Sequence, residues 1–520
     1  MDTVQARGRP VPSKTPVPVV VEYLTTHGEL VHATGDDPAS GPYWLPMTGQ
    51  NPADPDTWEA PVRLTSARFR HLLNQHFPDI LPVKAKCKDY VEAASAHAYA
   101  GRKVPTVGWS AKEGRGQDTT IRVAISPAIV IAISAAVVRP EPNGRTGLYR
   151  IPDEFDALRW AGLVQGLANV DNPCALRAAR AAVVDHLPPP TADTPLTQDE
   201  QAALVLAWWA GLLAEPVCRG RPLLTMLGEP GSGKTLTAYL MGILYYGDRF
   251  EVGGGVGGSR QIKDLVAGMV HSPLAVADDL TNVKREAVDT LCRLATGSAV
   301  KLATMHETLH LSSFKARAAA ILTSARPGWA LRDDMLSRIL PVRFDKPARS
   351  PMTDNNRVDR VLTHREAAWG ELILATQAAL QAPARATYYT RFQDWEAVVQ
   401  AVAEEGGWFP VLVQAMRKLP VQRVSVATSA SLEVAALYAI AKQFEDEPRD
   451  WTVADLYDLV SEKMGAMLSD DQRFRPSGRM RIQDFVRFLH RVETEGSAAV
   501  SLHSRGEQRG QQVWTLRPRA

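Results

Sequence analysis

The segment Gly228–Thr235 reads GEPGSGKT and constrains the fold of this chain more than any other stretch. It fits the pattern G-x-x-x-x-G-K-[ST], in which backbone N–H groups of a loop and of the following helix surround phosphate groups. Glycine is needed there because a Cβ atom would keep phosphate away from the backbone. The apolar run Pro222–Leu227 precedes the segment, and apolar residues at helical spacing follow in KTLTAYLMGILYY. The sequence therefore predicts a strand, a phosphate-binding loop and a helix, in that order.

A second apolar run, Pro273–Leu280 (PLAVADDL), ends in two carboxylates. Asp278 is expected to hold Mg²⁺ through water, and Asp279 to orient the attacking water. The sequence thus predicts ATP and Mg²⁺ as cofactors, with Lys234 neutralising the β- and γ-phosphates and Thr235 binding Mg²⁺. The predicted nucleotide contacts are Gly228, Glu229, Pro230, Gly231, Ser232, Gly233, Lys234 and Thr235.

A competing motif lies downstream, where His306–His310 spells HETLH and fits the zinc-peptidase pattern H-E-x-x-H. Zinc binding requires both histidines on one face of a helix and a further ligand. The flanking residues instead alternate, with Val300 and Leu302 before the motif and Leu309 and Leu311 at its end. A period of two favours strands. We therefore expect a hairpin with MHET at its turn, and zinc peptidase remains an alternative.

Composition sets outer limits on the class of protein. A chain of 520 residues is too long for one core, and 45% hydrophobic with 22% charged residues is typical of a folded protein. Lys+Arg 59 against Asp+Glu 57 leaves any nucleic-acid contact to local patches. The four cysteines form no CxxC pair, which disfavours a zinc ribbon and a disulfide framework. The most apolar run, Ala124–Val138, is shorter than the roughly 20 residues of a membrane span, so we expect a cytoplasmic protein without membrane contact.

Domain boundaries are expected where composition changes. The stretch HLPPPTADTPLTQDE interrupts regular structure because proline lacks a donor, and a helix should follow it, with Thr197 and Glu200 as a capping box. Residues 221–344 alternate short apolar runs with longer segments, as α/β proteins do. The predicted parts are a tail (1–18), an α+β domain (19–150), a helical segment and linker (151–195), a P-loop ATPase domain (196–350), a helical domain (351–445) and a winged-helix-like domain (450–520).

The segments GEPGSGKT, AVADDL, DTLCRLATGSAVKLATMHETLHLSSFKARAAAILTSA and LRDDMLSRILPVRF occur in one order. Over residues 195–350 the chain resembles the ATPase core of superfamily-three and AAA+ replicative helicases of phages, plasmids and integrative elements, including the C-terminal halves of primase–helicases. The resemblance implies an α/β fold with an AAA+-like P-loop core. It also implies DNA as a partner and a homo-oligomeric ring, commonly a hexamer. Before residue 190 there is no primase or polymerase signature.

The resemblance also implies roles for residues outside the two motifs. LATG followed by an alternating, basic-tipped stretch is similar to a hairpin that grips DNA, which makes Lys301 and His306 candidate DNA contacts. Ser324, or Thr323 beside it, is similar to the polar sensor of the γ-phosphate.

Arg338 resembles the arginine finger that reaches the nucleotide of a neighbouring subunit, and Arg332 is the alternative. Such a finger requires a ring, because one subunit cannot complete its own site. Asp279 stands where many related ATPases have glutamate.

The C-terminal residues predict a winged helix that contacts DNA. WTVADLYDLVSEKMG begins with Thr452 and Asp455 at capping-box spacing. The segment IQDFVRFLHRVE directs Arg481, Arg487 and Arg491 outward and places a set of apolar residues on one face. That set is Ile482, Phe485, Val486, Leu489 and Val492. From residue 472 to 520, ten arginines against four acids give a net charge of +6, which suits phosphate binding; a solvated basic tail is the competing interpretation.

Three functions are compatible with these patterns. The first is an ATP-dependent DNA helicase or translocase of a mobile genetic element, acting in replication. The second is an ATP-dependent initiator or regulatory switch that binds an origin without unwinding it. The third is the zinc peptidase.

Overall fold

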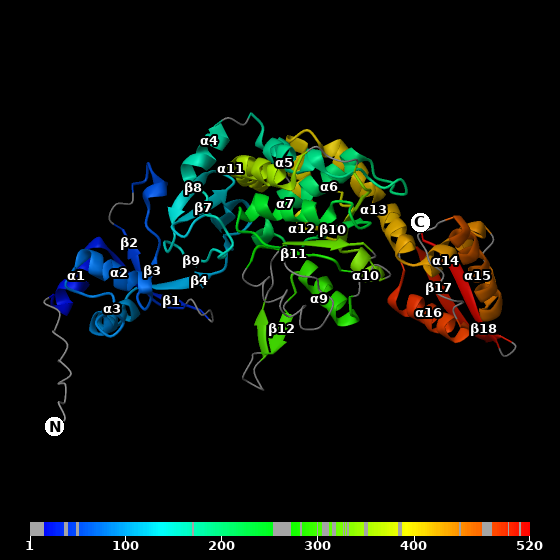
Figure 1. Ribbon diagram of the computed structural model, residues 1–520, viewed down its shortest axis with the longest axis horizontal. Helices are drawn as coiled ribbons and strands as arrows, with labels where there is room; N and C mark the ends of the chain where they lie inside the picture. Colours follow the sequence, from blue (N-terminus) through cyan, green and yellow to red (C-terminus); the bar gives the residue numbers. More distant parts are fainter. Residues whose placement is uncertain are drawn as a thin grey trace, which may run out of the picture. The chain divides into compact units, whose positions relative to one another are not determined.

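The computed structural model describes most of the chain. The described residues are 15–35, 40–47, 51–168, 171–252, 272–280, 283–298, 300–303, 311–314, 319–325, 327, 329, 332–347, 352–382, 387–446, 449–470, 481–497, 499–508 and 511–519. They form a mixed α/β protein with two compact units (Figure 1). The first unit comprises Met1–Gly114, Thr120–Pro152 and Ala157–Val164, and the second comprises Arg115–Thr119, Asp153–Asp156 and Gln165–Ala520.

The first unit contains two sheets. A five-stranded sheet has the order β3-β2-β1-β4-β9, and its helices bury Leu24, Trp44 and Phe69 in one core. A four-stranded antiparallel sheet has the order β5-β6-β7-β8. Its central β7 is buried and lies within the apolar run 124–138, as the sequence predicts for a buried element. The elements are α1 (Val17–His27), β1 (Gly28–Thr34), β2 (Gly41–Pro46), β3 (Val62–Arg63), α2 (Ala67–His76), α3 (Lys88–Ala100), β4 (Lys103–Val107), β5 (Ser110–Glu113), β6 (Thr120–Ala124), β7 (Ile129–Ser134), β8 (Val138–Pro142), β9 (Leu148–Tyr149) and α4 (Trp160–Ala168), which continues past the unit's end.

A four-stranded parallel sheet is the centre of the second unit. Its order is β11-β14-β10-β15. In register, Leu227 lies opposite Ser324, and Gly228 lies opposite Phe344. Because all strands are parallel, the segments that follow β10, β11 and β14 meet at one edge of the sheet. The elements of this part are α5 (Arg177–Ala182), α6 (Gln198–Ala210), β10 (Leu223–Gly228), α7 (Lys234–Tyr246), β11 (Leu274–Ala277), α9 (Arg285–Ala295), β12 (Val300–Ala303), β13 (Leu311–Phe314), β14 (Ala319–Ser324), α10 (Asp333–Leu336) and β15 (Ile339–Phe344).

Long helices cover this core and fix the helix that follows the glycine motif. They are α11 (Asp354–Gln381), α12 (Gln393–Glu405), α13 (Phe409–Ala430) and α14 (Leu432–Gln443). From α11, Arg365 Nη2 donates to the carbonyls of Tyr245 at 3.2 Å and Tyr246 at 2.9 Å. These bonds satisfy carbonyls that a helix end leaves without partners. Burial lowers the pKa of Arg365 to about 10, so the group stays charged at neutral pH.

The proline-rich stretch 187–197 differs from the predicted linker, because it is bonded to the parallel sheet of the second unit. Pro189 accepts a hydrogen bond from the Asp345 N–H at 2.8 Å, and Pro190 bridges to Phe344. Asp193 pairs with Arg343 at 2.7 Å. Proline lacks an N–H but keeps its carbonyl, so such a stretch can pair along the edge of a sheet. The predicted capping box of Thr197 and Glu200 is present at the start of α6.

Glu371 on α11 is buried and caps the start of α5. The Ala178 N–H donates to both carboxylate oxygens, at 3.1 and 2.9 Å. Burial raises the pKa of Glu371 to about 7, and backbone hydrogen bonds to the carboxylate oppose that shift. The charged form is therefore costly in the folded protein.

We expect Glu371→Gln to flatten the pH dependence of stability. Between pH 4.5, the ordinary pKa of a glutamate, and about pH 7, the folded state binds more protons than the unfolded state, so stability falls as pH rises through that range. The full effect, present above pH 7, is on the order of 3 kcal/mol. Melting temperatures of both proteins, measured from pH 5 to 8, check this. If the melting temperatures of the two proteins change with pH in the same way, the shifted titration does not belong to Glu371.

The C-terminal part of the second unit combines a three-stranded antiparallel sheet, order β16-β18-β17, with two helices. Its elements are β16 (Asp450–Thr452), α15 (Val453–Asp470), α16 (Ile482–Glu495), β17 (Val500–Gln508) and β18 (Gln511–Pro518). As predicted, the Thr452 hydroxyl caps α15 by accepting the Asp455 N–H at 3.2 Å. The prediction that Ile482 lies on the buried face of α16 is wrong. It begins α16 and is 46% exposed, whereas Phe488 completes the buried face.

Among the described residues, no helix combines the length and apolar character that crossing a membrane requires.

Candidate nucleotide-binding site

The glycine loop, Gly228–Gly233, joins β10 to α7 at the carboxyl edge of the parallel sheet. Gly231 and Gly233 have φ values of +83° and +85°, in the left-handed region that favours glycine. A Cβ atom on Gly228 would lie 2.4 Å from the Phe344 carbonyl oxygen. These glycines are therefore required by the backbone path of the loop as well as by close approach of a ligand.

The loop leaves donors available for an anion. Gly233 precedes α7 and provides no side-chain cap for its first N–H groups. Ser232 is fully buried, and its hydroxyl has no hydrogen-bond partner among the described residues. Because helix N-termini attract anions through their free N–H groups and dipole, this geometry fits a phosphate group. The residues present therefore suit the triphosphate that the motif predicts.

Lys234 and Thr235 begin α7 and form hydrogen bonds with different parts of the site. The ammonium of Lys234 donates to the Glu229 carbonyl at 3.3 Å, across the loop. Burial lowers the pKa of Lys234, while the carboxylates of Asp278 and Asp279 oppose that shift. The Thr235 hydroxyl donates to Asp278 Oδ1 at 2.9 Å. A hydroxyl beside a carboxylate at a phosphate loop is the donor set that Mg²⁺ uses in such sites.

The two carboxylates follow β11 and are held by Thr323 of β14. The Thr323 hydroxyl donates to Asp278 Oδ1 and accepts the Asp279 N–H at 3.0 Å. The next residue, Leu280, donates its N–H to the Thr323 carbonyl at 2.8 Å. Asp279 has φ +52°, which is uncommon outside glycine and occurs at functional sites. The structure thus brings together Lys234, both aspartates and the end of β14.

Ser324, the first choice for the sensor, lies on the other side of β14. Its hydroxyl donates to the Leu280 carbonyl at 2.9 Å, so it is already bonded away from the carboxylates. Thr323, the alternative, contacts both of them. Because successive side chains of a strand point to opposite faces, only one of the two can face the site, and the geometry favours Thr323.

Replacing Thr323 with valine, which keeps its shape, should lower ATP turnover by about 10- to 100-fold, because Asp278 and the Asp279 N–H lose a buried partner. Ser324→Ala should lower the melting temperature but leave turnover within about threefold, since it removes one ordinary backbone contact. Phosphate release under saturating ATP measures both. A larger loss of turnover in Ser324→Ala than in the Thr323 variant would instead identify Ser324 as the sensor.

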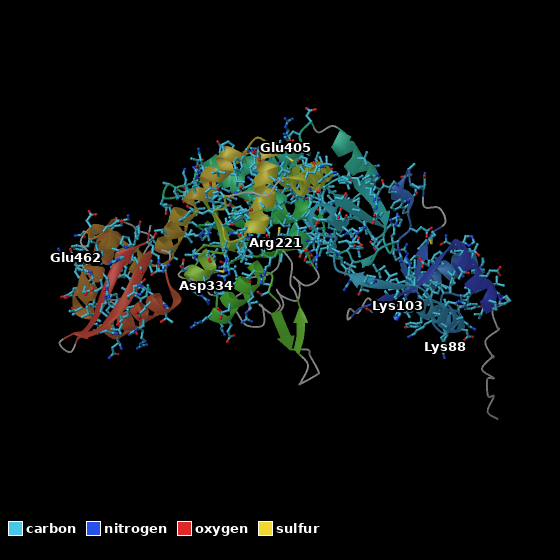
Figure 2. All side chains as sticks on the ribbon, turned by 180° about the vertical axis from the view of Figure 1, so that it is seen from behind. Lys88, Lys103, Arg221, Asp334, Glu405 and Glu462 are labelled. Carbon is cyan, nitrogen blue, oxygen red and sulfur yellow. The ribbon has the colours of Figure 1, made fainter. Side chains whose placement is uncertain are left out.

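The region around HETLH contains the predicted strands. β12 and β13 pair antiparallel, with Val300 opposite Phe314 and Ala303 opposite Leu311. They form a sheet of their own that projects from the core in Figures 1 and 2. Lys301 lies in β12, opposite Ser313. His306 and the rest of the HETLH motif lie outside the described residues.

The two candidate arginine fingers, Arg332 and Arg338, flank α10. They differ in how fully nearby carboxylates neutralise the charge of the guanidinium group. Arg332 pairs with Asp289 at 2.7 Å and with Asp334 at 2.8 Å (Asp334 is labelled in Figure 2). Burial alone would lower the pKa of Arg332, but the hydrogen bonds that its guanidinium donates to these carboxylates raise it. Arg338 donates to the Asp334 backbone carbonyl, and its Nε is buried without a partner among the described residues. Arg338 is therefore the freer of the two cations.

The three C-terminal arginines are exposed, as the periodicity of α16 predicts. Arg481 immediately precedes the helix. Arg487 is 76% exposed and lies 3.4 Å from Asp484, and the guanidinium of Arg491 lies 5.8 Å from the centre of the Phe488 ring.

No protein-family model matches the chain, and no curated protein matches its sequence. Two solved structures are similar in fold. The SCCmec type IV Cch, titled an active helicase, is 10% identical with a TM-score of 0.41, over 94% of this chain and 93% of that one. The apo A form of the NrS-1 C-terminal region is 9% identical with a TM-score of 0.34, over 84% of this chain and 91% of that one. At such low similarity, we base the function on the site's geometry.

Proposed function

We propose that this chain is an ATP-dependent DNA helicase or translocase of a mobile genetic element, working in replication as a homo-oligomeric ring. The observation that carries the proposal is the Thr235–Asp278 hydrogen bond of 2.9 Å, which joins the glycine loop to the end of β11. Two segments 43 residues apart in sequence are brought together there, with Lys234 beside them.

In this proposal each residue has a defined task. The N–H groups of the glycine loop and the Lys234 ammonium hold the phosphates of ATP. Thr235 and Asp278 hold Mg²⁺, which neutralises charge on the transferring phosphoryl group. Asp279 orients the attacking water, and Thr323 fixes the position of both carboxylates through its hydroxyl.

DNA contacts are proposed at two places. The β12–β13 pair carries Lys301 in β12 and would grip a single strand. We propose that α14, β16, α15, α16 and the β17–β18 pair form a winged helix, with α16 as its recognition helix. Exposed Arg481, Arg487 and Arg491 would meet phosphates there.

The experiment that tests the proposal compares ATP hydrolysis with and without single-stranded DNA, together with displacement of a strand from a forked duplex. Strong stimulation and strand displacement are expected of the motor. A winged-helix-like arrangement with an arginine-bearing helix also suits duplex DNA, which favours an origin-binding initiator as the second candidate. Duplex binding with slow, unstimulated hydrolysis and no displacement would select that alternative.

A further inference from the structure

Two aromatic rings lie in the first unit, on a sheet face where the helical cover ends. Leu30 of β1 is buried in one core with Ala98 of α3. His32 is two residues further along β1 and therefore on the same face, but it is only half-buried. Its ring lies edge to face with that of Tyr99, with 4.6 Å between the ring centroids. Tyr99, in the last turn of α3, is 54% exposed, so a large aromatic ring is open to solvent here.

Basic residues accompany the two rings. Lys103 of β4 (labelled in Figure 2) is the Cα partner of His32 in the parallel β1–β4 pair, so the two side chains leave the same face. Lys103 is exposed, and among the residues that the structure describes it has no carboxylate partner. Arg145, whose carbonyl accepts a hydrogen bond from Arg102 Nη1 at 3.1 Å, is a second exposed cation. Glu29 lies on the opposite face by strand alternation, where Arg102 binds it at 2.8 Å. Three cations and one carboxylate leave a net charge of +2 among these four residues.

We infer that His32, Tyr99 and Lys103 form a contact site for single-stranded nucleic acid, with one base stacked on the Tyr99 ring and an adjacent phosphate bound by Lys103. An edge-to-face pair occupies at most one face of the tyrosine ring, so the other face is left for a base, and His32 holds the ring in place. An exposed aromatic ring beside a cation is the combination by which proteins bind unpaired strands.

The chemistry of the site favours an unpaired strand over other anions. The bases of a duplex are already stacked on one another, so a duplex would offer the site only its phosphates and leave the ring unused. A free nucleoside triphosphate concentrates several charges at one place, whereas Lys103 supplies one charge, which matches the single charge of each phosphate in a strand. The proposed function assigns its DNA contacts to the second unit. This inference goes beyond it by adding a contact in the first unit that needs no hydrolysis of ATP.

The test measures binding of fluorescein-labelled oligo-dT to the full chain by anisotropy, without nucleotide and over a range of salt concentrations. Tyr99→Ala should weaken binding by about 5- to 100-fold, the range expected when one stacked base is lost. Its salt dependence should stay unchanged, because no charge is removed. Tyr99→Phe should keep most of the affinity, whereas Tyr99→Leu, which is apolar but not aromatic, should lose as much as the alanine variant. Because the side chain is exposed and alanine favours helix, folding should be preserved.

The phosphate contact has its own measurement. Lys103→Gln should reduce the slope of log affinity against log salt concentration by about 0.7, the value for one phosphate of a single strand. Lys88→Gln is the matched control, since Lys88 is another exposed lysine of the first unit and lies 3.7 Å from Glu92. Its affinity and its slope should stay near those of the wild type.

Oligo-rU measured in parallel shows whether the strand is DNA or RNA, and a loss in Tyr99→Ala with either one supports the site. Equal affinities of the wild type and Tyr99→Ala for both oligonucleotides would overturn it. So would equal changes of slope in Lys88→Gln and Lys103→Gln, which would indicate diffuse attraction to surface charge. If Tyr99 contributes to binding but the protein never hydrolyses ATP, the proposed function fails while this site stands.

Discussion

Lys234→Ala should abolish ATP hydrolysis, with a loss of at least about 10²- to 10³-fold, because the developing charge on the transferred phosphoryl group loses its main fixed cation. The ammonium lies over the glycine loop, 3.3 Å from the Glu229 carbonyl, and is largely buried. Water therefore cannot replace it at the same place. Release of inorganic phosphate measures the loss, and nucleotide affinity should fall as well.

Lys346→Ala is the matched control for Lys234→Ala. Lys346 lies beside the same loop, 3.5 Å from the Glu229 carboxylate, but its side chain is 61% exposed. Exposed ion pairs contribute little, so its removal should leave turnover near the wild-type value. Retained turnover in Lys234→Ala, or an equal loss in the control, would contradict the assignment of the site.

Arg338→Ala should spare nucleotide binding and lower turnover by about 10³-fold or more, the range expected of an arginine finger. Arg338 immediately precedes β15, whose other end lies beside the glycine loop, so in the proposed ring the loss should arise at a neighbouring copy. Mixing this variant with Lys234→Ala should therefore restore part of the activity. In mixed rings, some interfaces combine an intact loop from one variant with an intact arginine from the other.

Arg332→Ala serves as the comparison for that experiment. Its guanidinium is held by Asp289 and Asp334, so the change should reduce stability more than turnover. Absence of rescue in the mixture would count against shared sites. A larger loss of turnover in Arg332→Ala than in Arg338→Ala would reverse the choice between them.

Features set by neighbouring residues could be predicted from the sequence. The glycine loop, its strand and its helix follow from local spacing, and alternation correctly predicts the strands on both sides of HETLH. The end of β11 is likewise marked by Asp278 and Asp279. Each of these predictions uses the spacing of residues within one segment of the sequence. Tertiary packing does not change the element that this spacing predicts.

Features set by packing could not be predicted. The choice between Thr323 and Ser324 depends on which face of β14 meets β11, and both residues suit the end of a strand equally well. Arg391 belongs to a segment without a motif, and only the tertiary fold brings it to Ser337, next to Arg338 in the chain. Ile482 has the right periodicity for the buried face of α16, yet it is the first residue of the helix and is 46% exposed.

The proline-rich stretch has a practical consequence for dissecting the protein. A Cβ atom on Gly233 would lie 3.1 Å from Pro188 Cγ, so this stretch is one wall of the glycine loop. A shortened polypeptide that starts at residue 196, where composition alone would place the cut, would discard that wall together with the Pro190 partner of β15. A polypeptide that starts ahead of Arg177 would keep both, and would show whether the parallel-sheet part of the protein can be studied in isolation.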